Sequence, residues 1–381
     1  MKLLIVIAAM LLAGTAQAQP APALRLEITG PPVSAVPSAR AGCDALDIPD
    51  APARAVRLAT GEVELYATHF LNRVDIGADL LHLGHRCPVV MKGANNDDPA
   101  AFNDRAWIAS PWTPDGHTVW AVVHNEFQGN YRPALCPSRR YMDCWYNALT
   151  AAVSRDGGHT FERAPGRALV AALPYRFDQL ERGHHGYFNP SNIVTLAGAQ
   201  YMFAFATQAR AQRNGNCLLR TTALDTPDAW RGWDGSAFAV AFADPYAQPV
   251  QQPEAHVCAP VGQGSLRWPV TSLVRHGQSG LFIALMQDGA RGGGVYYATS
   301  PDLLHWSGPA LLLPAVGLGA WTCADPAPIA YPSLLDPAAS DRNFETVGLA
   351  PVLFATRFNP KGCKADTDRE LVRWDVRIAA P

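Results

Sequence analysis

Glu126 stands at the polar end of an otherwise apolar run, and its carboxyl group is the clearest candidate for chemistry in this chain. The run TVWAVVHNEF is rich in β-branched and aromatic residues, as strands are, and Glu126 follows His124 near its end. A charge at that place costs free energy unless it is paired or used. Two further carboxyl groups, Asp50 and Asp104, open other short strand-like runs. Carboxyl groups in different surroundings can donate and accept protons, so these residues suggest acid–base chemistry.

A recurring turn motif indicates the strands that must position these residues. SRDGGHTFER, from Ser154, contains an Asp, a glycine and an aromatic residue in the order that is typical of a tight turn leading into a strand. Relatives of this turn are ADLLHL (78–83), LDTPDAW (224–230) and SPDLLHW (300–306). Their spacing is about 70 residues, which is longer than the period of helical solenoids. The Asp of each turn is therefore predicted to shape the turn and not to act in catalysis.

Each repeat contains three strand-like runs, the turn and a fourth run. Five such units fit, beginning near Asp50, Asp104, Phe188, Trp268 and Tyr331. Four-stranded antiparallel sheets repeated around a channel form a β-propeller, so we predict an all-β, five-bladed β-propeller over residues 46–381. A β-sandwich also has many short strands, but the regular repeat favours the propeller. The fifth unit lacks an outer strand, and LRLEITG (24–30), in the lead-in 19–45, is predicted to supply it and close the ring.

Two short patterns resemble known propeller families. Ser-x-Asp-x-Gly-x-Thr-Phe at 154–161 is similar to the Asp box of sialidases. ATSPDLLHW (298–306), together with DAPARAV at the start of the first unit, resembles the five-bladed glycoside hydrolases of the arabinanase, β-xylosidase and invertase kind. The pattern is also similar to uncharacterised secreted propellers of bacteria.

The resemblance to the five-bladed hydrolases implies a role for each carboxyl group. In those enzymes an Asp of blade one, an Asp of blade two and a Glu of a later blade surround the sugar. Asp50 then corresponds to the base or nucleophile, Asp104 to the residue that tunes the pKa or stabilises the transition state, and Glu126 to the acid. This chain departs from the pattern because blade three, where the acid is expected, offers Asn189 and Asn192. Glu254 is the reserve candidate for the acid.

Polar and aromatic side chains at the ends of the inner strands are candidates for binding a carbohydrate. The candidates are Arg54, His69, Arg73, His124, Asn125, His185, Tyr187, Asn189, Asn192, Trp268, Asp288, Tyr331 and Arg357. Trp268 and Tyr187 have ring faces that could stack on sugars, but they could equally be core aromatics. His184 and His185 are adjacent and point apart if they lie on a strand, so a loop or sugar-contacting role is favoured over a metal site. We predict no metal and no cofactor.

Three functions remain open at this stage. The first is a glycoside hydrolase, and the second is a noncatalytic carbohydrate-binding propeller that has lost its acid. The third is a sialidase-type enzyme, which would need Arg54, Arg105 and Arg357 to converge in the funnel. Asp50 could also be an ordinary turn residue, and Asp104 could form a surface pair with Arg105. The sequence has no GxSxG nucleophile elbow and no phosphate-binding or dinucleotide fingerprint.

The first 18 residues predict export. Lys2 precedes the apolar run LLIVIAAMLLAG, which is too short to span a bilayer, and Ala16-Gln17-Ala18 forms a small-x-small cleavage site. We therefore expect a secreted or periplasmic protein without a membrane anchor. With 31 Lys and Arg against 33 Asp and Glu, the charge is near neutral and favours neither nucleic acid nor an anionic membrane as a partner. A monomer is expected.

All 8 cysteines follow the predicted cleavage site. An even number of cysteines in an exported protein favours disulfide bonds over a metal cluster, since no zinc-type spacing is present. Only the pairing Cys136–Cys144 is predicted, because it closes a short loop. That bond is expected to hold the approach to Glu126.

Overall fold

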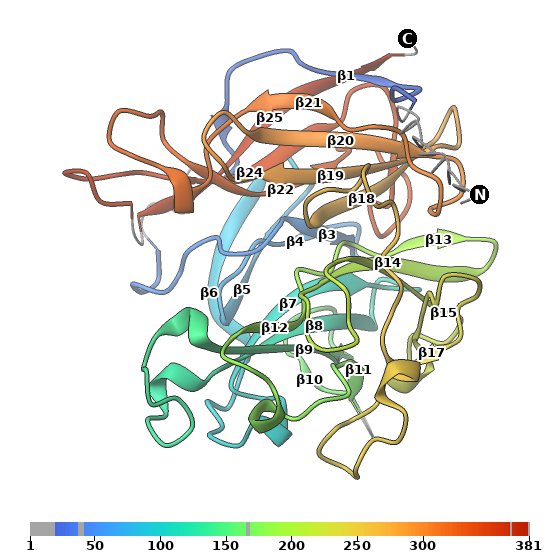
Figure 1. The fold of residues 1–381 in the computed structure, drawn as a ribbon. Coiled ribbons are helices and arrows are strands. Elements are labelled where there is room, and N and C mark those ends of the chain that lie inside the picture. Colours follow the sequence, from blue (N-terminus) through green and yellow to red (C-terminus); the bar gives the residue numbers. More distant parts are fainter. Residues whose placement is uncertain (1–19, 37–41, 165–167, 366–367, 380–381) are drawn as a thin grey trace, which may run out of the picture.

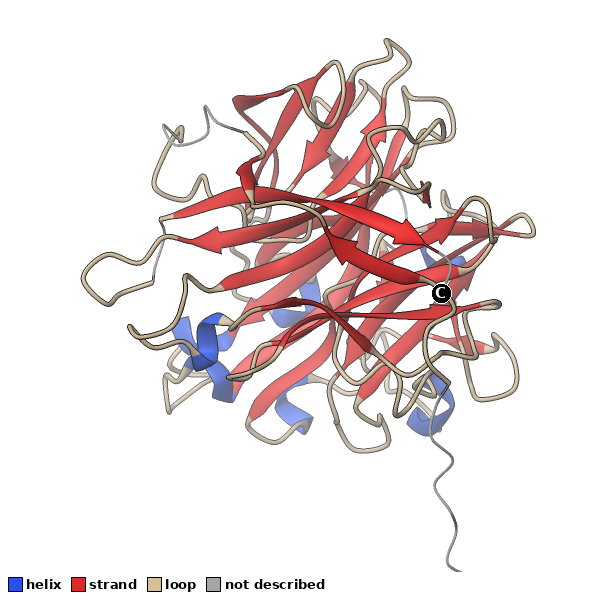
Figure 2. Ribbon diagram, turned by 90° about the horizontal axis from the view of Figure 1, so that it is seen from above, coloured by secondary structure: helices blue, strands red, loops and turns tan. Residues whose placement is uncertain are grey.

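The computed structural model describes residues 20–36, 42–164, 168–365 and 368–379. The predicted signal peptide, residues 1–18, lies outside the described residues. Within them the fold is all-β, and helices occur only as short 3-10 turns in the loops (Figure 2). None of these described helices is long and apolar enough to cross a membrane. The 3-10 turns are η2 Pro99–Ala101, η3 Gly129–Tyr131, η4 Tyr141–Asp143, η5 Phe177–Gln179, η6 Pro227–Ala229, η7 Pro253–His256 and η8 Leu318–Ala320.

The first sheet of the chain has four antiparallel strands in sequential order, as short connections favour. Its apolar residues face inward along the first two strands, which are almost completely buried. The strands are β3 Arg54–Arg57, β4 Val63–Tyr66, β5 Leu71–Gly77 and β6 Leu83–Lys92.

The largest sheet has 11 strands and consists of two antiparallel groups joined by β12. β12 pairs in parallel with β9 through Gly183–Gly186 and antiparallel with β14 through Tyr187 and Phe188. The first group contains β7 Arg105–Trp112, β8 Val119–Gln128, β9 Cys144–Ser154, β10 Glu162–Arg163 and β11 Leu169–Ala171. The joining strand and second group are β12 Gly183–Phe188, β13 Val194–Leu196, β14 Ala199–Ala206, β15 Gly215–Thr221, β16 Arg231–Gly232 and β17 Val240–Ala241.

The C-terminal third forms two more sheets, which lie together in the upper half of Figure 1. One contains β18 Val270–His276, β19 Phe282–Asp288, β20 Gly294–Ser300, β21 Ala310–Pro314 and β23 Thr346–Val347. The other contains β22 Ile329–Leu335, β24 Val352–Phe358, β25 Arg369–Ala379, β1 Arg25–Ile28 and β2 Val33–Ser34. β1 pairs antiparallel with β25, so that Arg25 lies opposite Ala379 and the first strand lies beside the last.

Five hydrophobic clusters hold these strand groups together, and each cluster lies between two neighbouring groups. Going along the chain, the clusters join β3–β6 to β7–β8, β8–β9 to β14–β15, β14–β15 to β18–β20, and β18–β20 to β22–β25. The remaining cluster joins β22–β25 back to β3–β4. The groups therefore pack face to face in a closed ring, with burial of apolar surface as the main stabilising term.

The Asp turns stabilise connections between strands. Asp156 accepts hydrogen bonds from the backbone N–H and the hydroxyl of Thr160, at 3.0 and 2.6 Å. Asp302 accepts from the backbone N–H groups of Leu304 and His305, at 3.0 and 2.8 Å. Phe161, which follows the first of these turns, packs into the core. The Asp side chains at these turns are occupied by local hydrogen bonds.

All 8 cysteines are paired. The bonds are Cys43–Cys87, Cys136–Cys144, Cys217–Cys258 and Cys323–Cys363. The predicted Cys136–Cys144 bond is confirmed, and it closes the loop between β8 and β9. Four disulfides fit an extracellular or periplasmic protein.

Candidate active site

A pocket lies where the inner segments of several strand groups meet. Its polar and aromatic lining comes from β7, β8, β9 and β12, from the segments before β3 and after β12, and from β22. The lining side chains include Asp50, Trp107, His124, Glu126, Trp145, His184, Phe188, Asn189 and Tyr331. Of the residues predicted from the sequence, the pocket brings together Asp50, His124, Glu126, Asn189 and Tyr331.

Strand alternation explains which of the three residues His124, Asn125 and Glu126 reach this pocket. Successive side chains on a strand point to opposite faces, so His124 and Glu126 share one face of β8. Asn125 points to the other face, where its amide donates to the hydroxyl of Thr150 at 2.6 Å. Glu126 lies opposite Arg105 on β7 and Asn147 on β9, in the middle of a paired sheet. Its backbone is therefore fixed on both sides.

The carboxyl group of Glu126 is buried, with only 8% of the residue exposed. Burial raises the pKa of Glu126 to about 8, and the negative charge of Asp50 adds to the rise. The hydrogen bond from Gln128, whose amide donates to Oε2 at 2.7 Å, and the positive charge of Arg105 oppose it. At neutral pH this carboxyl group therefore carries a proton, as a general acid requires.

Asp50 lines the same pocket but has a different environment. Its Oδ1 forms an ion pair with Arg369 and accepts a hydrogen bond from the hydroxyl of Tyr331 at 3.2 Å. The Nε2 atom of His69 lies 3.6 Å from Oδ2. A guanidinium and a hydroxyl donor are partners that suit a carboxylate.

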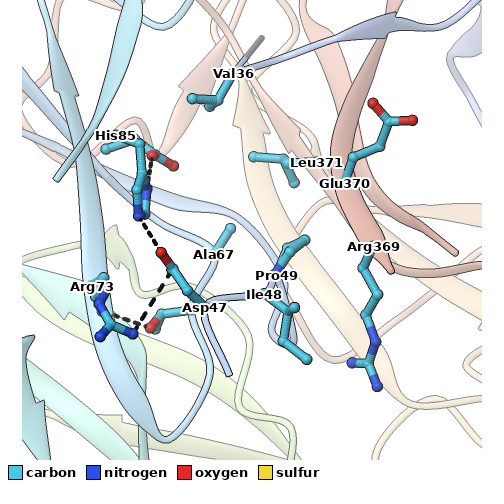
Figure 3. A pocket seen from close by; sticks show the side chains of 12 residues that line it. Val36, Asp47, Ile48, Pro49, Ala67, Arg73, His85, Arg369, Glu370 and Leu371 are labelled. Carbon is cyan, nitrogen blue, oxygen red and sulfur yellow. Dashed lines mark hydrogen bonds and ion pairs between the residues drawn. The ribbon is translucent and has the colours of Figure 1, made fainter. Parts of the chain in front are cut away.

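The segment before Asp50 is held by side chains that line a second pocket (Figure 3). There His85 lies between two carboxylates, with Nε2 2.8 Å from Asp47 and Nδ1 2.8 Å from Asp75. These hydrogen bonds raise the pKa of His85 to about 9. Arg73 pairs with Asp44 in the same segment. Together with the Cys43–Cys87 bond, these contacts tie residues 43–47 to β5 and β6, three residues before Asp50.

Cys43, Asp47 and His85 lie close enough together to suggest a metal site. The sulfur of Cys43, however, is bonded to Cys87 and has no thiolate to offer. Both ring nitrogens of His85 are instead engaged by carboxylate oxygens of Asp75 and Asp47. This cluster is a structural network.

Aromatic rings and neutral imidazoles surround Glu126. The ring of Trp145 stacks on His184 with centroids 3.9 Å apart, and the centroid of the Tyr141 ring lies 4.4 Å from that of Trp145. Burial lowers the pKa of His124 to about 3 and that of His184 to about 4, so both rings are neutral at pH 7. Within the described residues, Trp107 Nε1 and His124 Nε2 have no hydrogen-bond partner. Both residues line the pocket, and a buried polar nitrogen without a partner is unusual.

The sequence did not single out Trp107, Trp145 or Arg369. Trp107 and Trp145 stand in strand-like runs where an aromatic residue is as typical of a core as of a site. Arg369 reaches Asp50 from a strand more than 300 residues away. His184 was considered only as one of an adjacent pair. It lines this pocket, whereas His185 points into a neighbouring pocket and contacts the carbonyl of Glu181 at 3.0 Å.

Asp104 does not line the pocket. Arg132 binds both of its carboxylate oxygens, each at 2.9 Å, and the backbone N–H of Gln128 also donates to it at 2.9 Å. These bonds fix the loop that follows β8. Asp104 thus pairs with Arg132, and not with Arg105 as in the alternative to its catalytic role.

Most other predicted binding residues have structural partners outside the pocket. Tyr187 donates to Gln212 at 2.6 Å, and Asn192 bridges to the backbone of Leu273. Trp268 stacks on Tyr296 with centroids 4.7 Å apart, and Asp288 accepts from the N–H of Ala290 at 3.0 Å. Arg73 lines the second pocket, and the reserve acid Glu254 is exposed in η7.

The three arginines of the sialidase alternative do not converge. Arg54 is fully buried among backbone carbonyls. Arg105 packs between the rings of Phe70 and Tyr131, at 4.9 and 4.8 Å from their centroids. Arg357 pairs with Glu370.

The structure resembles the catalytic domain of a GH62 α-L-arabinofuranosidase from Coprinopsis cinerea, with 10% identity, a TM-score of 0.50, and coverage of 93% of this chain and 97% of that one. For an α-L-arabinofuranosidase from Podospora anserina, in complex with cellotriose, the identity is 11% and the TM-score 0.49, and the match covers 94% of this chain and 98% of that one. For an α-L-arabinanase from Cellvibrio cellulosa, complexed with arabinohexaose, the identity is 12% and the TM-score 0.48, and the match covers 86% of this chain and 91% of that one.

The chain thus has the fold of the β-propeller glycoside hydrolases, as its resemblance to them implied. No protein-family model matches the sequence, and no curated protein matches it. Identities near 10% establish the fold alone. Function must therefore be argued from the pocket.

Proposed function

We propose that this protein is a secreted or periplasmic glycoside hydrolase built on a five-bladed β-propeller, with Glu126 as general acid and Asp50 as base or nucleophile. The observation that carries the proposal is that one pocket holds two carboxyl groups in opposed environments. Glu126 is buried and protonated at neutral pH, while Asp50 faces a guanidinium. Two such groups are what glycosidic cleavage requires.

The five-bladed architecture is supported by the ring of core clusters between successive strand groups. The pairing of β1 with β25 supports the lead-in as the source of the last blade's outer strand. Export is supported by the predicted signal peptide and by the four disulfides.

In the proposed reaction, Glu126 donates its proton to the glycosidic oxygen as the bond to the leaving sugar breaks. The carboxylate of Asp50 either removes a proton from the attacking water or attacks the anomeric carbon itself. Arg369 and the hydroxyl of Tyr331 hold that carboxylate in place. The indole of Trp107 and the imidazole of His124 are proposed to bind sugar hydroxyl groups through their unpaired nitrogen atoms.

The substrate is proposed to be a neutral glycan. The walls beside Glu126 are indole rings and uncharged imidazoles, which favour the apolar faces and hydroxyl groups of sugars over charged groups. The fold is shared with an α-L-arabinofuranosidase, so arabinose-containing glycans are the first to test.

A noncatalytic carbohydrate-binding propeller is the second candidate. The arrangement that favours it is the bidentate pairing of Asp104 with Arg132, which leaves the pocket with two carboxyl groups where the resembled enzymes have three. The two candidates predict different outcomes with the same glycans.

The test is incubation of the purified protein with a panel of arabinose- and xylose-containing glycans, with detection of new reducing ends and measurement of binding. A hydrolase releases product from at least one glycan. Binding without product supports the second candidate, and neither binding nor product across the panel contradicts both.

A further inference from the structure

One arginine and four serines occupy corresponding places on the segments that meet at the centre of the ring. The five residues are Arg54, Ser110, Ser191, Ser272 and Ser333, and none is more than 1% exposed. The serines connect neighbouring segments, since Ser110 donates to the carbonyl of Ser191 at 2.5 Å and Ser333 to that of Ala53 at 2.7 Å. Four small side chains leave room at the axis for one large one.

The guanidinium of Arg54 fills that room and uses all five of its N–H groups. Its Nε donates to the carbonyl of Ala109 at 3.1 Å. Nη1 donates to the carbonyl of Ala53 at 3.1 Å and to the hydroxyl of Ser333 at 3.0 Å. Nη2 donates to the carbonyls of Pro190 and Thr271, at 3.2 and 2.7 Å. Each acceptor belongs to a different strand group, so one side chain is bonded to every group of the ring.

A buried cation usually requires a carboxylate partner. The five acceptors here are four carbonyl groups and one hydroxyl group, whose dipoles point at the charge. Burial lowers the pKa of Arg54. Complete hydrogen bonding is what allows the charge to be held there, because a partly satisfied guanidinium would be strongly destabilising.

The guanidinium also lies directly beneath the candidate active site. Ala109 and Pro190, two of its acceptors, line that pocket. Ala53, a third acceptor, lies three residues after Asp50. The side chain that joins the strand groups is thus bonded to the backbone that forms the pocket floor.

We propose that Arg54 is an axial plug: its guanidinium closes the centre of the ring below the pocket and positions the pocket floor. This role replaces the substrate-binding role predicted for Arg54 from the sequence. It is independent of the reaction proposed above, because it concerns the shape of the pocket and not what the pocket binds.

The first test is thermal melting of Arg54→Ser, which would complete a ring of five serines and leave a guanidinium-sized space. The melting temperature should fall by about 5 °C or more. Guanidinium chloride at about 20 mM should restore part of that loss, relative to the same variant in equal NaCl, and should not raise the melting temperature of the wild type. Recovery with NaCl or urea to the same extent, or no recovery at all, overturns the plug.

The second test reads the pocket floor itself, by NMR of ¹⁵N-histidine-labelled protein. The imidazole signals of His124 and His184, which line the pocket, should shift in Arg54→Ser and return toward the wild type with guanidinium. Leu218→Ala, a cavity variant in β15 outside the pocket lining, is the control and should leave both signals in place. Unmoved signals in Arg54→Ser, or equal shifts in Leu218→Ala, contradict a positioning role.

Arg54→Lys covers the case in which the serine variant does not fold. Lysine keeps the charge but offers three donors in place of five. It should melt below the wild type and shift the same two histidine signals. A lysine variant that matches the wild type in both measurements contradicts the proposal.

Discussion

Glu126 and Asp50 line the same pocket but have different surroundings. One carboxyl group is desolvated within a paired sheet, and the other faces Arg369 at the end of a loop. If Glu126 is the acid, kcat/KM should fall as pH rises through about 8, because the proton that it donates is lost above that pH. A pH–rate profile on an active glycan checks this. A rate that keeps rising from pH 7 to pH 9 would contradict the assignment.

His124 makes the stability of the fold depend on pH, with the loss on the acid side. Its pKa of about 3 in the folded protein lies below its ordinary value near 6.5, so unfolding takes up a proton in between. Stability from the neutral ring is present above pH 6.5 and is lost as pH falls toward 3. His124→Phe should therefore show a shallower decline in melting temperature between pH 6.5 and pH 4 than the wild type. Parallel curves would show that His124 does not set the acid sensitivity.

At the scale of elements, the loop between β8 and β9 links the disulfide to the pocket. It carries Tyr141, which packs against Trp145 beside Glu126, and it is closed by Cys136–Cys144. Replacing both cysteines by serine should cost about 2–3 kcal/mol of stability, as expected for a short closed loop. It should also weaken glycan binding, because Tyr141 loses its support. Chemical denaturation and titration with a bound glycan measure the two effects.

The bond Cys323–Cys363 provides the matched control for that loop. It joins segments outside the pocket lining, so the corresponding double serine variant should lose stability but keep its glycan affinity. Equal losses of affinity in the two variants would show that the β8–β9 loop has no particular role at the pocket.

The segment 43–50 is a second element whose position matters, and His85 fixes it. The folded-state pKa of about 9 lies above the ordinary value near 6.5. The stabilisation is therefore fully present below pH 6.5 and is lost as pH rises through about 9. His85→Gln should melt well below the wild type at pH 6 and close to it at pH 10. An equal difference at both pH values would mean that the charge on His85 contributes nothing.

At the scale of the whole molecule, local patterns predicted much of the architecture. The Asp turns and strand-like runs are short-range features, and the Cys136–Cys144 bond closes a short loop, so each can be recognised in a few residues. Glu126 was found because a charge ending an apolar run is conspicuous. Asp50 was found through resemblance to a family pattern, and it lies in the same pocket as Glu126.

What the sequence could not predict depends on long-range pairing. Nothing near Asp104 indicates that Arg132 binds both of its oxygens, or that Arg369 reaches Asp50 from the last strand. Asn125 and His185 were wrongly predicted to face the pocket. Each is adjacent in sequence to a residue that does face it, and strand alternation turns its own side chain away. The arginine among four serines is visible in the sequence only once the five inner segments are aligned.

The most direct test of the central claim is turnover by Glu126→Gln on whichever glycan the panel identifies. Glutamine has the shape of the protonated acid and keeps an acceptor for Gln128, so melting temperature and glycan affinity should remain close to those of the wild type. Turnover should fall by about 10²-fold or more, and Asp50→Asn should cost at least as much. Near-normal turnover in the folded Glu126→Gln protein would contradict the account and remove this residue from the mechanism.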